Sequence, residues 1–221
     1  MVRIYYHIYA IEGVESIIDE QIYLIEKYFN FPFQLNIGIS IANENVTSKS
    51  LLNKIYAYNK HNYKIRDIRC RGNEFTTLDL IEEDRNIFGD SDYIFYLHTK
   101  GASKINEWNY DYLVDWRNLM HFFNIEKYNS VFKIFETTEY NTYGINLKTP
   151  TNIKKMAYFG NFWWAKANYI KTLDNKKMDK GNRIDAEFSF IQCGENWKPF
   201  TPFNSNVNHY YEAFPKEKYR Q

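Results

Sequence analysis

The chain has 221 residues, 44% of them hydrophobic and 25% charged, and its 28 Lys and Arg against 27 Asp and Glu leave a formal net charge of +1. The length predicts a single globular domain, and the balanced charge excludes a general nucleic-acid binder, which needs a clear basic excess. The sequence has no apolar stretch long enough to span a membrane and no signal-peptide pattern, and Cys70 and Cys193 are too few for a disulfide scaffold or a cysteine zinc site, so we expect a cytoplasmic protein.

Short apolar runs alternate with helical patterns in the first half of the chain. Strands are expected at 3–9, 35–42, 63–69 and 93–97, and helices at 16–29, 47–58 and 73–88. An order of strands and helices that alternate in this way is typical of a parallel sheet covered by helices.

The second half is less regular. Helices are expected at 110–123, 125–135 and 185–193, and strands at 142–147 and 157–165, whereas the tail from 197 onward has no clear periodicity. Because no Gly/Ser-rich linker or internal repeat divides the chain, we expect one α/β domain over 1–221, with a mostly parallel central sheet flanked by helices.

The residues that follow each expected strand are the first candidates for a site, because open parallel sheets bind ligands beyond the carboxyl ends of their strands. The strand at 93–97 is followed by His98, Thr99, Lys100 and Gly101. Gly101 allows a sharp turn or the close approach of a ligand, and Lys100 with His98 could face a phosphate. A solvated turn is the alternative.

Two further segments allow both a binding and a structural interpretation. Arg71 and Asn73 open the helix expected at 73–88, where backbone N–H groups suit an anion or a polar base edge, but Asn73 is also an ordinary helix cap. Asp185 and Glu187 begin a short helix, where a carboxylate could be a general base or an acid favoured by the helix dipole.

Metal and nucleophile motifs are weakly represented. Asp90 and Asp92 offer oxygen ligands of the kind that hard cations take, but they precede a strand, at the amino end of the expected sheet, so a turn is favoured there. The five histidines show neither HExxH nor paired spacing, and GxSxG, GxxxxGK[ST] and GxGxxG are missing from the sequence. Zinc hydrolase, serine hydrolase, P-loop and dinucleotide-binding functions are therefore unsupported.

Aromatic residues make up 19% of the chain. A genome rich in AT codons would produce this surplus without any function. A surface that stacks on sugars or bases would use it, because aromatic faces pack well against apolar ring faces. Composition alone leaves both explanations open.

Several longer segments together resemble one family. They are Arg71-Gly72-Asn73-Glu74, the run 93–101 with its HTKG end, 116–120, the GNFWWA run at 160–165, Asn182-Arg183, Ala186-Glu187 and 204–210. Over residues 2–215 the chain resembles a bacterial and viral group that carries an HTKG motif, which is similar to the GT-A glycosyltransferases and to rhamnan-synthesis F-type proteins.

The resemblance implies a GT-A-like, nucleotide-sugar-binding α/β fold, with 1–101 as the nucleotide-binding half and 102–221 as the acceptor-side half. GT-A enzymes normally end the fourth strand in an Asp-x-Asp motif that holds Mn²⁺ or Mg²⁺ on the donor diphosphate, and His98-Thr99-Lys100 stands at that position here. We hypothesise that Lys100, with His98, neutralises the departing diphosphate without a metal. Mn²⁺ or Mg²⁺ dependence stays open, with Asp90 and Asp92 as the fallback ligands.

The resemblance also implies roles for other residues. Glu187 is expected to be the catalytic base of an inverting transfer, with Asp185 as second choice, and His209 to reach the donor diphosphate. The remaining expected contacts are those to the nucleoside, from Tyr9, Ala10, Arg71 and Asn73, and those to the acceptor or sugar, from Gly160, Asn161, Trp163 and Trp164.

The expected function is transfer of a sugar from a nucleotide sugar to a hydroxyl of a glycan acceptor during polysaccharide biosynthesis, with a lipid carrier as an optional partner. One alternative is a non-catalytic subunit that binds carbohydrate or a nucleotide sugar on the same fold, since the Asp-x-Asp motif is missing. A nucleotidyltransferase is disfavoured, because Ile11-Glu12-Gly13-Val14 lacks the Gly-rich, basic loop that it would need after the first strand.

Overall fold

The computed structural model describes residues 1–42, 53–54, 57, 63–149, 155–174, 176 and 178–220. A seven-stranded sheet with the order β3-β2-β1-β4-β8-β5-β9 forms its centre. Its strands are β1 (Val2–Ala10), β2 (Phe33–Ile41), β3 (Tyr63–Cys70), β4 (Tyr93–His98), β5 (Thr142–Gly144), β8 (Trp163–Lys166) and β9 (Pro199–Phe200), and a separate pair comprises β6 (Leu147–Lys148) and β7 (Ala157–Tyr158).

The sheet is mostly parallel. The first four strands run parallel to one another, β8 lies antiparallel to both β4 and β5, and β9 continues parallel to β5. The prediction of an α/β domain with a mostly parallel sheet flanked by helices is therefore confirmed.

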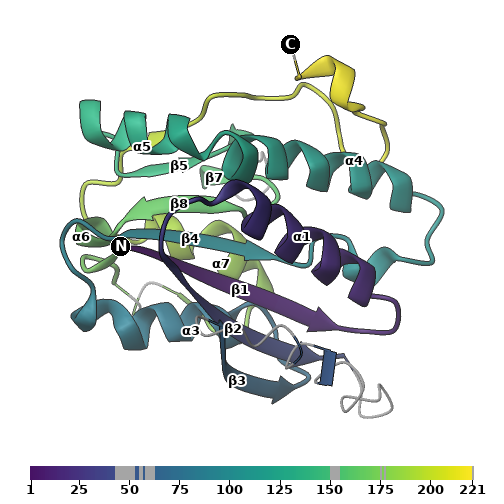
Figure 1. The fold of residues 1–221 in the computed structure, drawn as a ribbon, viewed down its shortest axis with the longest axis horizontal. Helices are drawn as coiled ribbons and strands as arrows, with labels where there is room; N and C mark the ends of the chain where they lie inside the picture. The colour runs from purple at the N-terminus through teal and green to yellow at the C-terminus, as the bar shows by residue number, and fades with distance from the viewer. Residues whose placement is uncertain are drawn as a thin grey trace.

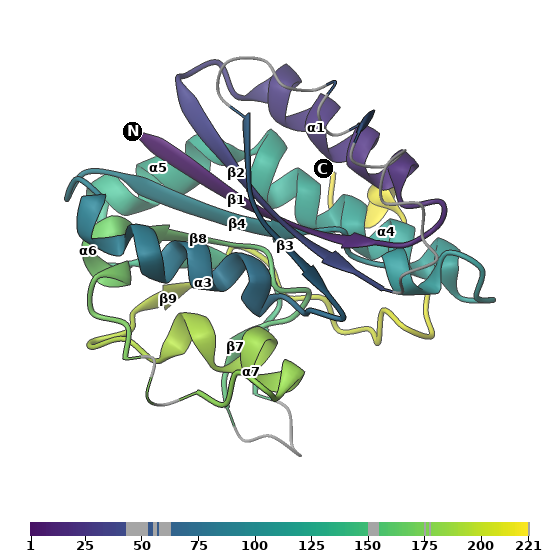
Figure 2. The ribbon, with the colours of Figure 1, turned by 90° about the horizontal axis from the view of Figure 1, so that it is seen from below.

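Helices cover both faces of the sheet, as Figure 2 shows. On one face lie α1 (Glu15–Tyr28), α4 (Tyr110–His121), the π-helical turn η3 (Phe122–Glu126) and α5 (Tyr128–Thr137); on the other lie α3 (Phe75–Asp84), α6 (Ala167–Ile170) and α7 (Arg183–Phe188). Short 3-10 turns complete the chain at η1 (Arg85–Ile87), η2 (Ala102–Lys104), η5 (Phe190–Gln192) and η6 (Lys216–Lys218). Among the described residues, no helix combines the length and apolarity that crossing a bilayer requires.

The alternation of side chains along the strands divides the core in two. Ile4, Tyr6 and Ile8 of β1 pack on the α1 side, whereas Tyr5 packs on the α3 side. Because both faces are covered, the central strands are apolar on both sides, which explains their short, continuous apolar runs in the sequence. The edge strand β3 instead alternates between buried or half-buried and exposed positions.

The second half departs from the predicted elements. The expected strand at 157–165 is two strands, β7 and β8, separated by a turn in which Gly160 and Asn161 both have positive φ. The expected helix at 125–135 begins later, at Tyr128, because η3 intervenes, and the expected helix at 185–193 ends at Phe188. The helix expected at 47–58 lies largely outside the described residues.

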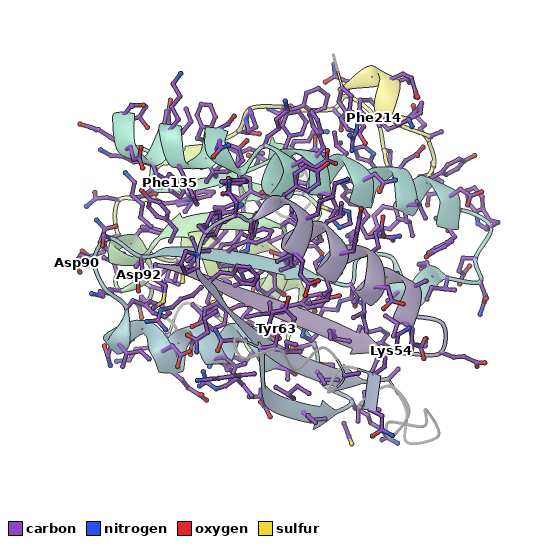
Figure 3. All side chains as sticks on the ribbon, viewed as in Figure 1. Lys54, Tyr63, Asp90, Asp92, Phe135 and Phe214 are labelled. Atoms are coloured by element: carbon purple, nitrogen blue, oxygen red, sulfur yellow. The ribbon has the colours of Figure 1, made fainter. Side chains whose placement is uncertain are left out.

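The C-terminal segment crosses back over α4, as Figure 1 shows in yellow. The backbone N–H of Phe214 donates to Asp115 Oδ2 of α4 at 3.1 Å, and the Phe214 and Tyr219 side chains are buried in the α1-side core. Figure 3 labels Phe214 at this contact. Tertiary packing, which leaves no periodic signature, therefore orders a tail whose only regular elements among the described residues are the short strand β9 and the turn η6.

Gly38 lets α3 approach the sheet closely. It lies at the irregularity in the β2–β3 pairing, and a Cβ there would stand 2.2 Å from Thr77 Oγ1 and 3.0 Å from Thr77 Cα. We predict that Gly38→Ala lowers the free energy of unfolding by about 1–3 kcal/mol, because α3 would have to move. Urea unfolding measures this change. Gly89→Ala is the matched control, since its Cβ would meet Asp92 Oδ1 at an ordinary 3.4 Å, and an equal loss in both variants would contradict the argument.

Candidate functional site

A cavity of about 280 Å³ lies at the carboxyl ends of β1 and β4. His7 and Tyr9 of β1, Gly72, Asn73 and Glu74 before α3, residues 98–104 after β4, Leu113 of α4, Arg183 and Tyr210 line it. Successive strands step from β1 to β2 and β3 on one side, whereas β4 pairs with β1 on the other. The cavity therefore occupies the point where the strand order reverses, the usual ligand crevice of an open α/β sheet.

The turn after β4 is held tightly around Lys100. Gly101 has φ +88°, and Arg117 Nη1 of α4 donates to the Lys100 carbonyl at 3.0 Å while its Nε pairs with Glu20 at 2.9 Å. The Thr99 hydroxyl accepts from the Tyr9 backbone N–H at 2.9 Å. The sharp turn that Gly101 predicts is present, and buried polar contacts fix it.

The Lys100 ammonium lies inside the protein with loose partners. The residue is only 7% exposed, and its Nζ stands 4.1 Å from the centre of the Trp116 ring and 5.6 Å from that of Tyr210. Glu187 Oε1 of α7 is 3.9 Å away, an ion pair beyond hydrogen-bond distance. Because a buried ammonium without close partners is costly, this arrangement favours an added anion.

Positive charge predominates in the cavity lining. Lys100, Lys104 and Arg183 face one lining carboxylate, Glu74, whose Oε1 lies 3.6 Å from Arg183 Nε. The site therefore suits an anionic ligand such as a phosphate or diphosphate.

His98 lines the cavity as a neutral group. Its Nε2–H donates to the Gly160 carbonyl at 2.9 Å, and burial together with the charges of Lys100 and Arg183 holds its pKa well below the usual range despite that bond. The expectation that His98 adds positive charge to the site is therefore corrected, because the ring stays uncharged at neutral pH. It anchors the turn at Gly160 instead.

His7 is a lining residue that the sequence did not single out. It pairs across the sheet with His98, its Nδ1 lies 3.0 Å from Thr77 Oγ1, and burial with the nearby Arg183 lowers its pKa to about 3. Arg183, Tyr210 and Glu74 were likewise not among the predicted site residues. A polar residue near the end of an apolar strand was the available signal for His7.

The two predicted carboxylates have different surroundings. Glu187 faces Lys100, as described above. The Asp185 carboxylate has a structural role: it accepts hydrogen bonds from the Ser189 hydroxyl at 2.6 Å and from the Asp179 backbone N–H at 2.8 Å. Burial alone would raise its pKa, but these bonds and Lys155 hold the pKa below its ordinary value. Of the two carboxylates, Glu187 is the one near Lys100, although it is not among the residues that line the cavity.

Two of the four predicted nucleoside contacts line the cavity. Tyr9 and Asn73 do, and the Asn73 side chain also accepts a hydrogen bond at 2.9 Å from the backbone N–H of Phe75, the first residue of α3. Glu74 holds the N-cap position of α3, one residue after the cap that the sequence suggested. Ala10 is buried within the sheet, and Arg71 is exposed with φ +56°. Neither of these two is among the lining residues.

His209 lies behind the cavity. Its ring stacks on Trp116 with centroids 5.0 Å apart, its Nε2 is 2.6 Å from the Ser205 hydroxyl, and burial with the charges of Lys148 and Lys100 lowers its pKa to about 4. It is not a lining residue. The geometry makes it a support for Trp116 and so for Lys100.

The expected acceptor residues at 160–164 belong to the core. Trp163 and Trp164 are 1% and 0% exposed, and they stack on Tyr96 and Phe95 of β4 with centroids 5.2 and 4.5 Å apart. The expectation that they contact the acceptor or sugar is corrected, because protein covers both rings almost completely. Gly160 contributes its carbonyl to His98, and Asn161 accepts from Trp163 Nε1 at 3.1 Å.

The fallback metal ligands lie at the opposite end of β4. Figure 3 shows Asp90 and Asp92 at the end of the sheet where the N-terminus lies. Asp92 pairs with the terminal ammonium at 2.9 Å and with Arg3 at 3.2 Å, whereas exposed Asp90 pairs with Lys171. Within the described ranges, no group of three His, Cys, Asp or Glu side chains could hold a metal ion. The residues around Lys100 thus do not fit the divalent-metal site that the resemblance would imply.

Comparison of the chain with protein-family models and with curated proteins finds no match.

The buried neutral histidines predict loss of stability in mild acid. Unfolded His7 takes up a proton near pH 6.5, whereas folded His7 stays neutral down to about pH 3. Since the unfolded state then binds more protons, stability falls as the pH falls through this window. We predict that His7→Asn reduces the loss of unfolding free energy between pH 7.5 and pH 5 by about 2 kcal/mol.

Urea unfolding at a series of pH values measures this slope. Lys133→Gln, a change at an exposed residue of α5 on the far side of the molecule from His7's partner helix α3, is the control and should keep the wild-type slope. A wild-type slope in His7→Asn would mean that folded His7 is already protonated.

Proposed function

We propose that the chain is a GT-A-type glycosyltransferase that moves a sugar from a nucleotide-sugar donor to a hydroxyl of a glycan acceptor, with inversion, in polysaccharide assembly. The observation that carries the proposal is the pairing of buried Lys100 with Glu187 at 3.9 Å, at the point where the strand order reverses. The HTKG and GNFWWA resemblance supplies the reaction class.

Lys100 binds the donor diphosphate in this proposal. The ammonium already stands in a site from which most water is excluded, where a fixed charge acts more strongly than in bulk water. Arg183 and Lys104 at the lining add to the field. As the bond from the anomeric carbon to the phosphate oxygen breaks, the nucleoside diphosphate keeps the electron pair, and Lys100 stabilises the charge that develops.

Glu187 acts as the general base. The diphosphate replaces Glu187 as the partner of Lys100, because 3.9 Å leaves no room for a sugar between the two groups. The released carboxylate takes the proton of the acceptor hydroxyl while that oxygen forms its bond to the anomeric carbon.

Lys100→Gln and Glu187→Gln separate binding from chemistry. We predict that one nucleotide sugar raises the Tm of the wild-type protein in EDTA, and that Lys100→Gln weakens this binding about tenfold or more because the buried cation is lost. Glu187→Gln should keep donor binding but lower turnover roughly 10²–10⁴-fold. Thermal shift with UDP-, GDP-, dTDP- and CMP-sugars, followed by a transfer assay, measures both effects.

Lys133→Gln on α5 serves as the matched control for a lost lysine. Equal donor binding by wild type and Lys100→Gln would contradict the proposal that Lys100 binds the diphosphate. Near-normal turnover in Glu187→Gln would contradict the assignment of Glu187 as the base. A thermal shift that needs Mn²⁺ would contradict metal-free neutralisation. Donor binding without any transfer would indicate the non-catalytic subunit instead.

A further inference from the structure

We infer that an exposed aromatic platform next to the cavity, formed by Trp108, Tyr211 and the lining residue Tyr210, binds the acceptor as a neutral oligosaccharide. This inference deepens the proposed function and rests on it. It moves acceptor recognition away from the buried Trp163 and Trp164 to a surface that faces solvent.

The platform stands out by exposure. Five aromatic side chains among the described residues are exposed, and three of them are Trp108 (71%), Tyr211 (65%) and Tyr210 (40%). The Trp108 and Tyr211 rings lie at 37° with centroids 6.2 Å apart, and half-buried Tyr112 meets Trp108 edge-on at 6.0 Å. Neighbouring exposed rings at a cavity are typical of a binding surface.

The platform is continuous with the proposed reaction centre. Tyr210 lines the cavity, stands 5.6 Å from Lys100 Nζ and packs edge-on against Trp116. Tyr210 thus packs on α4, on one face of the sheet, whereas Asn73 lies just before α3, which covers the other face. A donor nucleoside near Asn73 and an acceptor on the platform would therefore reach Lys100 and Glu187 from different sides.

The two segments of the platform are joined before any ligand binds. Buried Asn109 donates from Nδ2 to the Tyr210 carbonyl at 2.9 Å, and the Tyr211 backbone N–H donates to the Asn208 carbonyl at 2.9 Å. The bond from Phe214 to Asp115 ties the following residues to α4. Such preorganisation lowers the entropic cost of binding. Tyr and Trp side chains also lose little conformational entropy when a ligand contacts them.

The surrounding charge favours a neutral sugar over an anionic surface. Glu107, Asp111 and Glu212 are exposed and lie within three residues of the ring-bearing residues in the sequence. Of the nearby cations, Lys104 pairs with Glu107 at 3.5 Å and Lys100 is buried beneath Tyr210. An anionic membrane would be repelled by these carboxylates, because membrane-surface segments are polybasic. Carboxylates can accept hydrogen bonds from sugar hydroxyls, while the rings cover the apolar faces of the sugar.

Direct glycan binding tests the inference without nucleotide or turnover. Calorimetric titration with maltohexaose, cellohexaose, laminarihexaose and mannohexaose should show binding of at least one by the wild-type protein. Trp108→Ala and Tyr211→Ala should each weaken it about tenfold, or about 1.4 kcal/mol, and Trp108→Phe should restore part of the loss. Tyr23→Ala on α1, which removes a ring of 60% exposure elsewhere, is the matched control and should bind as wild type does.

Absence of binding to every hexasaccharide, or wild-type affinity in both alanine variants, overturns the inference. Binding of the wild-type protein to phosphatidylglycerol vesicles that is lost in Trp108→Ala overturns it in favour of a membrane surface. If a donor nucleotide sugar shifts the Tm but no glycan binds, the proposed transferase function stands and the role of the platform is rejected. If a glycan binds but no nucleotide sugar shifts the Tm, the role of the platform stands and the proposed transferase function is rejected.

Discussion

The buried ammonium of Lys100 is the constraint around which this end of the molecule is built. Removing a charge from water is costly, and the protein offsets that cost with the rings of Trp116 and Tyr210 and with a distant carboxylate. Arg117 holds the backbone of Lys100 in place from α4. An ammonium placed so rigidly, yet paired so loosely, is most stable when an anion completes its surroundings.

The buried histidines at this end of the sheet are neutral, so they add no positive charge to that of Lys100. His7, His98 and His209 have pKa values lowered by burial, so each ring serves as a neutral hydrogen-bonding or stacking group. Protonation of His98 or His209 would add a second buried charge near Lys100, and protonation of His7 would add one near Arg183. The same burial that holds the turn in place therefore makes the fold sensitive to acid.

The sequence predicted the first half of the fold better than the second. Buried parallel strands and amphipathic helices leave strong periodic signals, so β1, α1 and β4 were found nearly at their observed bounds. The strands β5 to β9 have two to four residues and depend on tertiary pairing, which carries little local signal. The site was found in part for the same reason. The end of the strand at 93–97 pointed to Lys100 and the resemblance pointed to Tyr9, whereas Tyr210 reaches the cavity from a tail without periodicity.

The aromatic surplus divides between two uses that composition could not separate. Trp163 and Trp164 lie in a strand covered on both faces, so large rings there fill the core by stacking on β4. Trp108 and Tyr211 lie in connections beyond the sheet, where covering them would require a further layer of protein. Most of the aromatic bias can thus be ordinary packing, while three of the five exposed rings among the described residues lie near the cavity. Position relative to the sheet, rather than residue type, therefore distinguishes a stacking ring of the core from a ring available to a ligand.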